Sequence, residues 1–321
     1  MSIRNRGFII NPEDLSKPLL FRLAACGMNE LGIHSGGGRR ASELIEKTLA
    51  WHRLESTQEL FRLAAEMDIM VEYDEHALRT LVPANLFSEH PDWFRMDEKG
   101  QRVSDFNICA SNEEALSFVS QRASWLAGAL NTPSHRHAYW IDDVTNAACH
   151  CRKCKNLKPA DQALRITNAV LKGLRAVDHK AIIGFLAYND AMDVPERTFP
   201  EKGVYLEYAP INRDSNAAIN DPSSAKNRAE TAKLRDMLQL FGTENARVLE
   251  YWMDNSRFSN WTKPPKRFTL NAEIMRRDVN YYYEMGFRDM TSFGCYLGPE
   301  YEALYGKAPI EEYCAVLREI Q

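Results

Sequence analysis

The stretch Met70-Val71-Glu72-Tyr73-Asp74-Glu75 decides the fold class, because it joins a β-strand composition to acidic side chains. Valine and tyrosine favour an extended strand. Side chains alternate along a strand, so Glu72 and Asp74 are expected to point to the same side. A strand that is buried on both faces is usually apolar throughout, and carboxylates within one therefore need a compensating polar environment.

Runs with strand composition recur eight times along the chain, separated by longer segments with helical apolar spacing. Strands that alternate with helices predict parallel pairing, and eight such units close a (β/α)8 barrel, also called a TIM barrel. The sequence therefore predicts a single α/β domain over residues 1–321, built as this barrel. The expected strands are residues 7–10, 30–34, 68–74, 137–142, 181–188, 204–208, 247–253 and 287–293.

Helices are expected between these strands. The clearest follows Ser111, with Glu113 and Glu114 in its first turn, where carboxylates complement the helix dipole. The crossover at residues 189–203 contains two prolines and little periodicity, so we expect it to be irregular. The expected helices are residues 112–130, 160–177, 225–241, 270–285 and 301–320.

Two connections are unusually long, residues 75–111 after the third strand and residues 143–159 after the fourth. Long loops inside compact domains are commonly functional. Both follow strands, so they are expected on the face where barrel active sites are built. We therefore expect the site at this face.

Composition excludes several classes of partner. The net charge of −4, with Lys and Arg dispersed among Asp and Glu, provides no basic field for nucleic acid. No apolar run approaches the roughly 20 residues that cross a bilayer. The N-terminal sequence lacks the pattern of a secretory leader, and the odd number of cysteines fits a reducing compartment, so a cytoplasmic location is expected. The sequence shows no motif for an organic cofactor, and it is compatible with a homo-oligomer.

Acidic residues end several of the expected strands. Tyr139-Trp140-Ile141-Asp142-Asp143 closes on two carboxylates, and Glu207 lies near the end of the sixth strand. On the seventh strand Glu250, Trp252 and Asp254 alternate, and we expect all three to face the barrel interior. Crowded carboxylates raise one another's pKa and so supply a protonated acid beside an ionised partner, as cleavage of a glycosidic bond requires. The alternative is structural pairing with backbone amides or arginines.

Aromatic and histidine side chains accompany these acids. Tyr188 and Trp252 are expected to stack on the apolar faces of a sugar, whereas Tyr251 is expected to point at the helices. The alternative for each is core packing. His34 and His76 end the second and third strands, where an imidazole can serve as a base or contact a hydroxyl group.

The segment Cys149-His150-Cys151-Arg152-Lys153-Cys154 supplies three thiols within six residues. Thiolates at this spacing suit tetrahedral zinc, which needs a fourth ligand. Candidates for that ligand are Cys109, His150 and His137. A zinc ion here would stabilise the long loop, and the alternative is a set of reduced, metal-free cysteines.

Several segments resemble a known family. They are residues 85–94 (NLFSEHPDWF), the run from Cys109 to Glu113, the Asp-ended strand before the Cys-x-Cys-x-x-Cys segment, and residues 250–256 (EYWMDNS) with 261–265 (WTKPP). The chain is similar in these to the bacterial domain-of-unknown-function 4838 family, which is grouped with barrel glycoside hydrolases such as β-hexosaminidases and α-glucuronidases. The resemblance implies a sugar-gripping role for Arg6 and a general acid at Asp143. Hexosaminidases carry Asp-Glu where this chain has Asp142-Asp143.

The first hypothesis is therefore a glycoside hydrolase acting on a carbohydrate substrate, with Asp143 as general acid and Asp142 or Glu207 as the partner carboxylate. The alternatives are a carbohydrate-binding barrel without hydrolytic activity and a metal-dependent sugar isomerase or lyase. The residues expected to bind the sugar are Arg6, His34, Glu72, His76, Tyr188, Trp252, Asp254 and Asn255.

Overall fold

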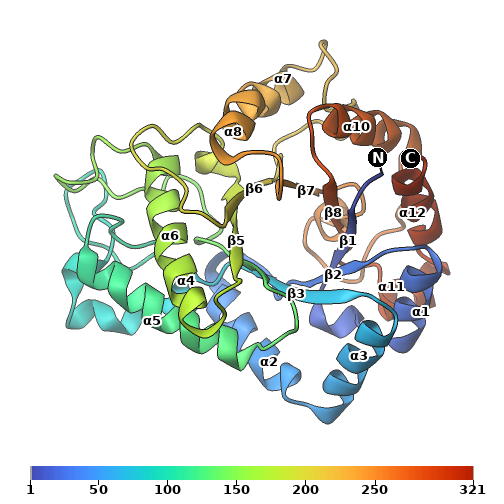
Figure 1. Cartoon of the computed structure of the whole chain (residues 1–321), viewed down its shortest axis with the longest axis horizontal. Helices are drawn as coiled ribbons and strands as arrows, with labels where there is room; N and C mark the ends of the chain where they lie inside the picture. The colour runs from blue at the N-terminus through green and yellow to red at the C-terminus, as the bar shows by residue number, and fades with distance from the viewer. Residues whose placement is uncertain (1, 321) are drawn as a thin grey trace.

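The computed structural model describes residues 2–320, in which eight parallel strands form one closed barrel in the order β1 to β8. Each strand pairs with the next, and β8 pairs with β1. Figure 1 shows the strands at the centre, with the helices around them. The predicted (β/α)8 fold is confirmed. The strands are β1 (Asn5–Ile10), β2 (Glu30–Ile33), β3 (Met70–Glu75), β4 (Arg136–Tyr139), β5 (Ile182–Ala187), β6 (Val204–Tyr208), β7 (Arg247–Glu250) and β8 (Asp289–Phe293).

β4 and β7 end earlier than the sequence predicts, at Tyr139 and Glu250. The backbone N–H of Trp140 still donates to the backbone oxygen of Glu75 on β3, and the residues beyond Trp140 and beyond Glu250 form loops at the carboxyl end of the barrel. These loops carry Asp142, Asp143 and Asp254, so the side chains of these residues do not follow the alternation of a strand.

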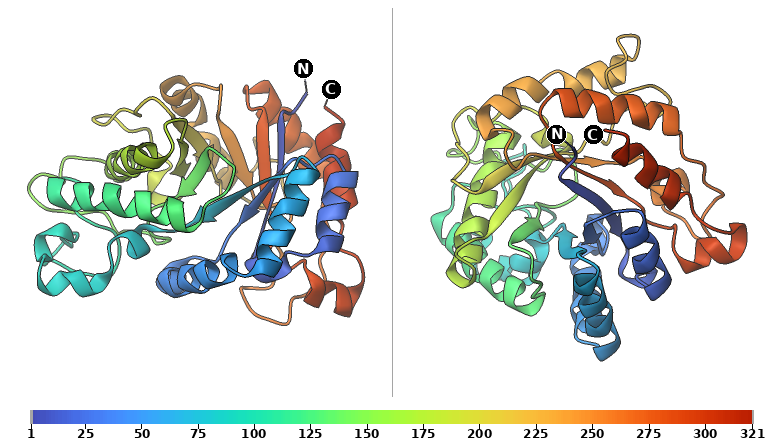
Figure 2. Two further views of the ribbon diagram at one scale, coloured as in Figure 1. Left: turned by 60° about the horizontal axis from the view of Figure 1, so that its bottom comes forward. Right: turned by 45° about the vertical axis from the view of Figure 1, so that its right-hand side comes forward.

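Helices cover the outside of the barrel, as the two views of Figure 2 also show. The expected helix at residues 225–241 is broken at 232–233, and that at 301–320 is broken between Gly306, whose φ is +81°, and Pro309. The α-helices are α1 (Lys17–Ala25), α2 (Ala41–His52), α3 (Glu55–Glu66), α4 (Leu78–Leu81), α5 (Glu113–Ala129), α6 (Pro159–Val177), α7 (Ala225–Thr231), α8 (Leu234–Phe241), α9 (Asn255–Phe258), α10 (Ala272–Glu284), α11 (Pro299–Tyr305) and α12 (Ile310–Arg318).

Short 3-10 helices lie within the connections, and the crossover before β6 is otherwise irregular, as predicted. They are η1 (Pro12–Asp14), η2 (Gly38–Arg40), η3 (Ala84–Ser88), η4 (Pro91–Trp93) and η5 (Asn189–Ala191).

The centre of the barrel is ionic. The guanidinium of Arg247 on β7 is fully buried and forms ion pairs with Glu30, Glu72, Asp74 and Glu207, which come from β2, β3 and β6. Four buried carboxylates around one cation cannot all be ionised without a large cost in free energy, because the barrel interior solvates charge poorly. Burial accordingly raises the pKa of Glu72, and it raises the pKa of Asp74 to about 7.

Glycines make room for these interior side chains. A Cβ atom on Gly32 would collide with the carboxylate of Asp74, and one on Gly184 would collide with that of Glu207. Each glycine lies on a strand beside the one that carries the carboxylate. The absence of a side chain at these two positions therefore allows the polar core to fit.

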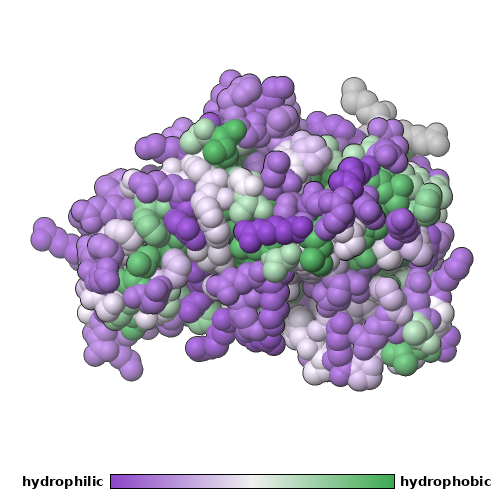
Figure 3. Space-filling view, turned by 90° about the horizontal axis from the view of Figure 1, so that it is seen from below, coloured by the Kyte–Doolittle hydropathy of each residue, from purple (hydrophilic) through white to green (hydrophobic). Residues whose placement is uncertain are grey.

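The surface in Figure 3 is mainly hydrophilic, with apolar residues in small, separate groups. Within residues 2–320, no helix is both long and apolar enough to span a bilayer.

Candidate active site

A cavity of about 520 Å³ opens at the carboxyl ends of the strands. Its walls include residues from the loops after all eight strands. This is the face on which barrels of this type build active sites. The lining residues with polar or aromatic side chains include Glu13, His34, Arg40, His76, Trp140, Asp143, Tyr188, Tyr251, Asp254, Trp261, Lys263, Phe293 and Tyr296.

Asp143 brings a carboxylate into this cavity from the loop after β4. The phenol of Tyr188 donates a hydrogen bond to its Oδ1 at 2.8 Å. The side chain packs against Gly37, where a Cβ atom would collide with the carboxylate. No described side chain donates to Oδ2, the carboxylate oxygen nearest to Gly37.

Asp254 supplies a second carboxylate from the loop after β7. Its Oδ1 caps α9 and accepts hydrogen bonds from the backbone N–H of Ser256 at 3.1 Å and of Arg257 at 3.3 Å, and from Oγ of Ser256. These hydrogen bonds lower the pKa of Asp254, but burial has the larger effect and raises it. Like Oδ2 of Asp143, its Oδ2 has no donor among the described residues.

His34 and His76 form the inner part of the cavity wall, with their ring centroids 6.0 Å apart. Each is anchored through Nδ1 by a backbone carbonyl, at Asp74 for His34 and at Ile141 for His76. Burial lowers the pKa of His34 to about 4, so its imidazole is neutral near neutral pH.

Aromatic rings line another part of the cavity. Trp140 packs against His76 with ring centroids 5.0 Å apart, and Tyr251 stacks on Phe293 at 5.5 Å. Trp261 lies at the cavity edge, where 66% of its surface is exposed. Its backbone φ of +52° is uncommon for a residue with a side chain and occurs frequently at ligand sites.

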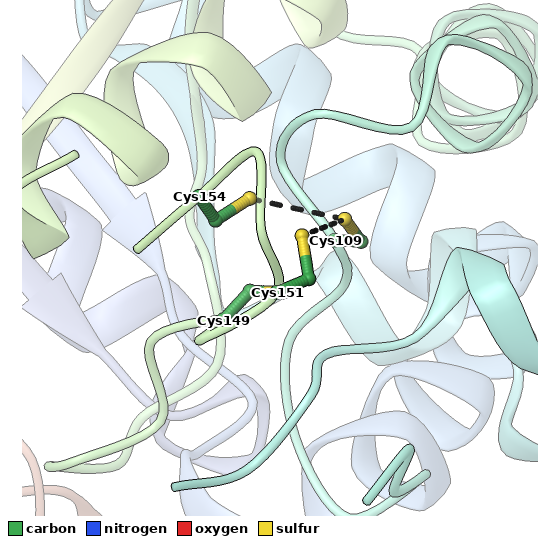
Figure 4. Close-up of side chains that lie close together, drawn as sticks. All are labelled: Cys109, Cys149, Cys151 and Cys154. Carbon is green, nitrogen blue, oxygen red and sulfur yellow. Dashed lines mark hydrogen bonds between the residues drawn. The ribbon is translucent and has the colours of Figure 1, made fainter. Parts of the chain in front are cut away.

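The four predicted cysteines form a separate cluster, shown in Figure 4. Cys109, from the long loop after β3, faces the segment that carries Cys149, Cys151 and Cys154. All four sulfurs lie within 4.8 Å of one another, and the cysteines are buried and free. Of the candidates for a fourth ligand, the structure brings Cys109 into the group and leaves His150 and His137 outside it. This buried cluster could hold a metal ion.

The sequence matches the family described as Domain of unknown function (DUF4838) over residues 41–304. The chain belongs to this family. The resemblance read from the sequence is thereby confirmed, and the DUF4838 match includes both Asp143 and Asp254 as well as all four clustered cysteines. No curated protein matches the sequence.

The DUF4838 chain shares its fold with solved glycosidases. The β-galactosidase from Rahnella sp. R3 superposes with a TM-score of 0.55 at 15% identity, over 100% of this chain and 56% of that chain. The β-galactosidase from the psychrophilic Marinomonas ef1 gives 0.53 at 13% identity, over 98% and 59%. The pneumococcal virulence factor StrH gives 0.50 at 12% identity, over 99% and 83%. The chain thus spans little more than half the length of the two galactosidases.

Asp142 and Glu207, the expected partners of Asp143, do not line the cavity of this DUF4838 chain. Asp142 is buried behind it and accepts a hydrogen bond from the backbone N–H of Asn107, and burial raises its pKa to about 6. Glu207 lies inside the barrel, where Arg247 neutralises it and Nε1 of Trp140 donates to its Oε2 at 2.7 Å. A ligand in the cavity would not reach either carboxylate directly.

Two expected sugar-binding residues also lie elsewhere. Glu72 is inside the barrel against Arg247. Arg6 belongs to the amino-terminal half of β1, and its guanidinium donates to the backbone oxygens of Ile3 and Gly27. It therefore stabilises the end of the barrel opposite the cavity.

The expected orientation of the seventh strand is wrong. Glu250 and Trp252 point outward, where Glu250 pairs with Arg213 and Nε1 of Trp252 donates to Asp278 of α10. Tyr251, expected among the helices, lines the cavity instead. Arg247 points into the barrel, where it forms the central ion pairs. Because side chains alternate along a strand, every second residue after Arg247 also points inward.

Asn255 is fully buried and donates to the backbone oxygen of Lys266 at 2.9 Å, so it supports the loop and does not line the cavity. His34, His76, Tyr188, Asp143 and Asp254 are brought together as expected. Sequence reasoning missed Phe293 and Tyr296, whose aromatic character after the eighth strand was an available signal.

Proposed function

We propose that this chain hydrolyses a glycosidic bond in the cavity at the carboxyl end of the barrel, with Asp143 and Asp254 as the two carboxylates. One observation supports the proposal above all. The two groups come from different loops, line the same cavity, and each keep one oxygen that no described side chain occupies. Hydrolysis of this kind uses two carboxylates on either side of the scissile bond.

The surroundings of the two groups suit different roles. Burial raises the pKa of Asp254, which favours the protonated form that a general acid requires. Asp143 accepts a hydrogen bond from Tyr188, which holds its carboxylate at the cavity wall, and we assign it the role of base or nucleophile. This assignment reverses the role expected for Asp143 from the sequence, and it replaces Asp142 and Glu207 as its partner.

The aromatic walls support a carbohydrate as the substrate. Rings of Trp140, Tyr251 and Trp261 line the same space as the carboxylates. Sugars present C–H faces that pack on such rings, while polar groups take their hydroxyls.

Hydrolysis of a panel of aryl glycosides by the whole chain tests the proposal. Asp143→Asn and Asp254→Asn should each lower kcat by about 100-fold or more, while Asp236→Asn, on the exposed face of α8, serves as the matched control. Because an activated leaving group needs little protonation, Asp254→Asn should lose less activity on dinitrophenyl than on methyl glycosides. Asp143→Asn should lose activity on both.

Other outcomes identify the rival functions. Full activity in folded Asp143→Asn would refute the proposed carboxylate pair. Sugar binding without turnover of any glycoside would favour a binding barrel. Activity that a chelator abolishes and a divalent cation restores would favour the metal-dependent isomerase or lyase.

We further propose that the four clustered cysteines hold a structural zinc ion. Sulfurs at the corners of a tetrahedron with Zn–S bonds of about 2.3 Å lie about 3.8 Å apart. The Sγ atom of Cys109 is 3.6 Å from that of Cys151 and 3.8 Å from that of Cys154, which fits this spacing. These distances are far longer than a disulfide bond. Zinc here would tie together the two long loops that flank the cavity.

A further inference from the structure

We infer that the inner wall of the cavity selects a neutral sugar through paired hydrogen-bond acceptors on His34 and His76, and disfavours sugars with a carboxylate or phosphate at that position. The inference rests on the proposed function for the identity of the ligand as a sugar. It adds the chemical class of that sugar.

The anchors of the two rings show which nitrogen of each carries a hydrogen. Nδ1 of His34 lies 2.6 Å from the backbone oxygen of Asp74, and Nδ1 of His76 lies 2.7 Å from that of Ile141. A carbonyl oxygen can only accept, so each Nδ1 must carry the hydrogen. In a neutral imidazole the other nitrogen, Nε2, is then an acceptor.

Both Nε2 atoms are available to a ligand. Each ring lines the cavity, and neither Nε2 has a hydrogen-bond partner among residues 2–320. Neither is among the fully enclosed, unpartnered polar atoms, in contrast to Nε2 of His137. The ring centroids lie 6.0 Å apart, so one sugar ring can place hydroxyls against both.

Neighbouring side-chain donors are already engaged. Nε1 of Trp140 donates to Glu207, the phenol of Tyr188 donates to Asp143, and Oγ of Ser35 donates to Glu75. This part of the wall therefore presents acceptors: two imidazole nitrogens and the free oxygen of Asp143.

The cations that line the cavity are more exposed than the two histidines and have partners. Arg40 is mostly exposed and pairs with Glu43, and Lys263 pairs with Glu13 and Glu300. A sugar hydroxyl can donate to each inner acceptor. A carboxylate or phosphate in the same place would have no donor to replace water and would face lone pairs, which costs binding free energy.

Calorimetry with matched sugars tests the inference on the whole chain. The probes are glucose against glucuronic acid and galactose against galacturonic acid, which differ only at the sixth carbon. For the pair that binds, the neutral sugar should bind at least about tenfold more tightly. A uronic acid that binds equally or better would overturn the inference, and so would the failure of every neutral sugar to bind at millimolar concentration.

Variants of His76 test the role of its Nε2 as an acceptor. In His76→Asn the amide can still donate to the oxygen of Ile141, but nothing replaces Nε2. Neutral-sugar binding should weaken by about three- to tenfold, and His135→Asn, an exposed histidine at the other end of β4, is the control. His76→Lys should shift the preference toward the uronic acid. His34→Asn is a second test of the acceptor. Unchanged affinity and preference in the two His76 variants and in His34→Asn would contradict the inference.

Binding and turnover separate this inference from the proposed function. Neutral sugars that bind without hydrolysis of any glycoside refute the function and leave the selectivity in place. Efficient hydrolysis of uronides refutes the selectivity and leaves the function in place.

Discussion

Asp142 and Asn107 form a reciprocal pair between the two long loops. The backbone N–H of Asn107 donates to Oδ2 of Asp142 at 2.6 Å, and the backbone N–H of Asp142 donates to Oδ1 of Asn107 at 3.1 Å. Asn107 adopts a φ of +49°, which asparagine tolerates better than most residues. This pair fixes the backbone directly before Asp143 and so orients that carboxylate toward the cavity.

Asn107→Ala should therefore affect both stability and catalysis. It removes one bond of the pair and places alanine in a strained conformation, so the free energy of unfolding should fall by about 1 to 3 kcal/mol. Because Asp143 loses its support, kcat should also fall. Urea denaturation and glycoside hydrolysis measure the two effects, and Asn280→Ala, on the exposed face of α10, is the control. A variant with native stability and activity would show that the pair has no such role.

The buried carboxyl of Asp74 predicts a pH dependence of stability. Burial raises its pKa to about 7, and the nearby charges of Glu207 and Glu30 add to this effect. An unfolded Asp has a pKa of about 3.9, so the native state binds more protons between about pH 4 and pH 7. Linkage then makes the free energy of unfolding fall as the pH rises through this window, through this group.

Asp74→Asn removes that titration and still offers an oxygen to Arg247. The decrease in stability from about pH 5 to about pH 7 should be smaller in this variant than in the parent chain. Urea denaturation at several pH values measures the slope, with Asp236→Asn as a surface control. The same slope in both chains would contradict the expected contribution.

Removing the guanidinium of Arg247 from the barrel centre should strongly destabilise the chain. Arg247→Ala leaves Glu30, Glu72, Asp74 and Glu207 without their shared counter-charge inside the barrel. Breaking a buried ion pair from one side costs about 3 to 5 kcal/mol. The melting temperature should drop strongly or the chain should fail to fold, whereas the exposed Arg62→Ala should melt like the parent. A melting temperature within a few degrees of the parent would refute the structural importance of this network.

Loss of the proposed zinc should destabilise the two long loops that carry the four cysteines. Purified chain should contain about one zinc per polypeptide by elemental analysis, and Cys151→Ser should reduce that content and lower the melting temperature. Cys295→Ser, at a buried cysteine outside the cluster, is the control for loss of a thiol. Metal-free protein with unchanged melting behaviour in the cluster variant would rule out a zinc that stabilises these loops.

Trp261 should contribute to the binding of longer ligands. Its ring is 66% exposed at the cavity edge, so Trp261→Ala should change the free energy of unfolding by less than about 0.5 kcal/mol. Stacking worth about 0.5 to 1.5 kcal/mol would raise KM for an oligosaccharide by about two- to tenfold. Steady-state kinetics with oligosaccharides of increasing length test this, and an unchanged KM throughout would exclude a contact with the sugar.

The sequence by itself determined the barrel. Eight strand-forming runs separated by amphipathic segments leave few other architectures, since parallel strands need helical crossovers. It also predicted the region of the candidate site, because loops after parallel strands meet at one end of a barrel. The places of His34, His76, Tyr188, Asp143 and Asp254 in one cavity, and the grouping of Cys149, Cys151 and Cys154, were predictable on this basis.

Only the tertiary structure decided which acids face the cavity and which the core. The position of a carboxylate depends on where its strand ends and on the cation that it meets, and both are set by contacts between distant segments. Glu72 and Glu207 form ion pairs with Arg247 inside the barrel, whereas Glu250 forms an ion pair with Arg213 outside it. The choice of Cys109 as the fourth sulfur likewise required two loops to meet. Local alternation carries no information about such partners, because the charge that pairs with a side chain lies far away in sequence.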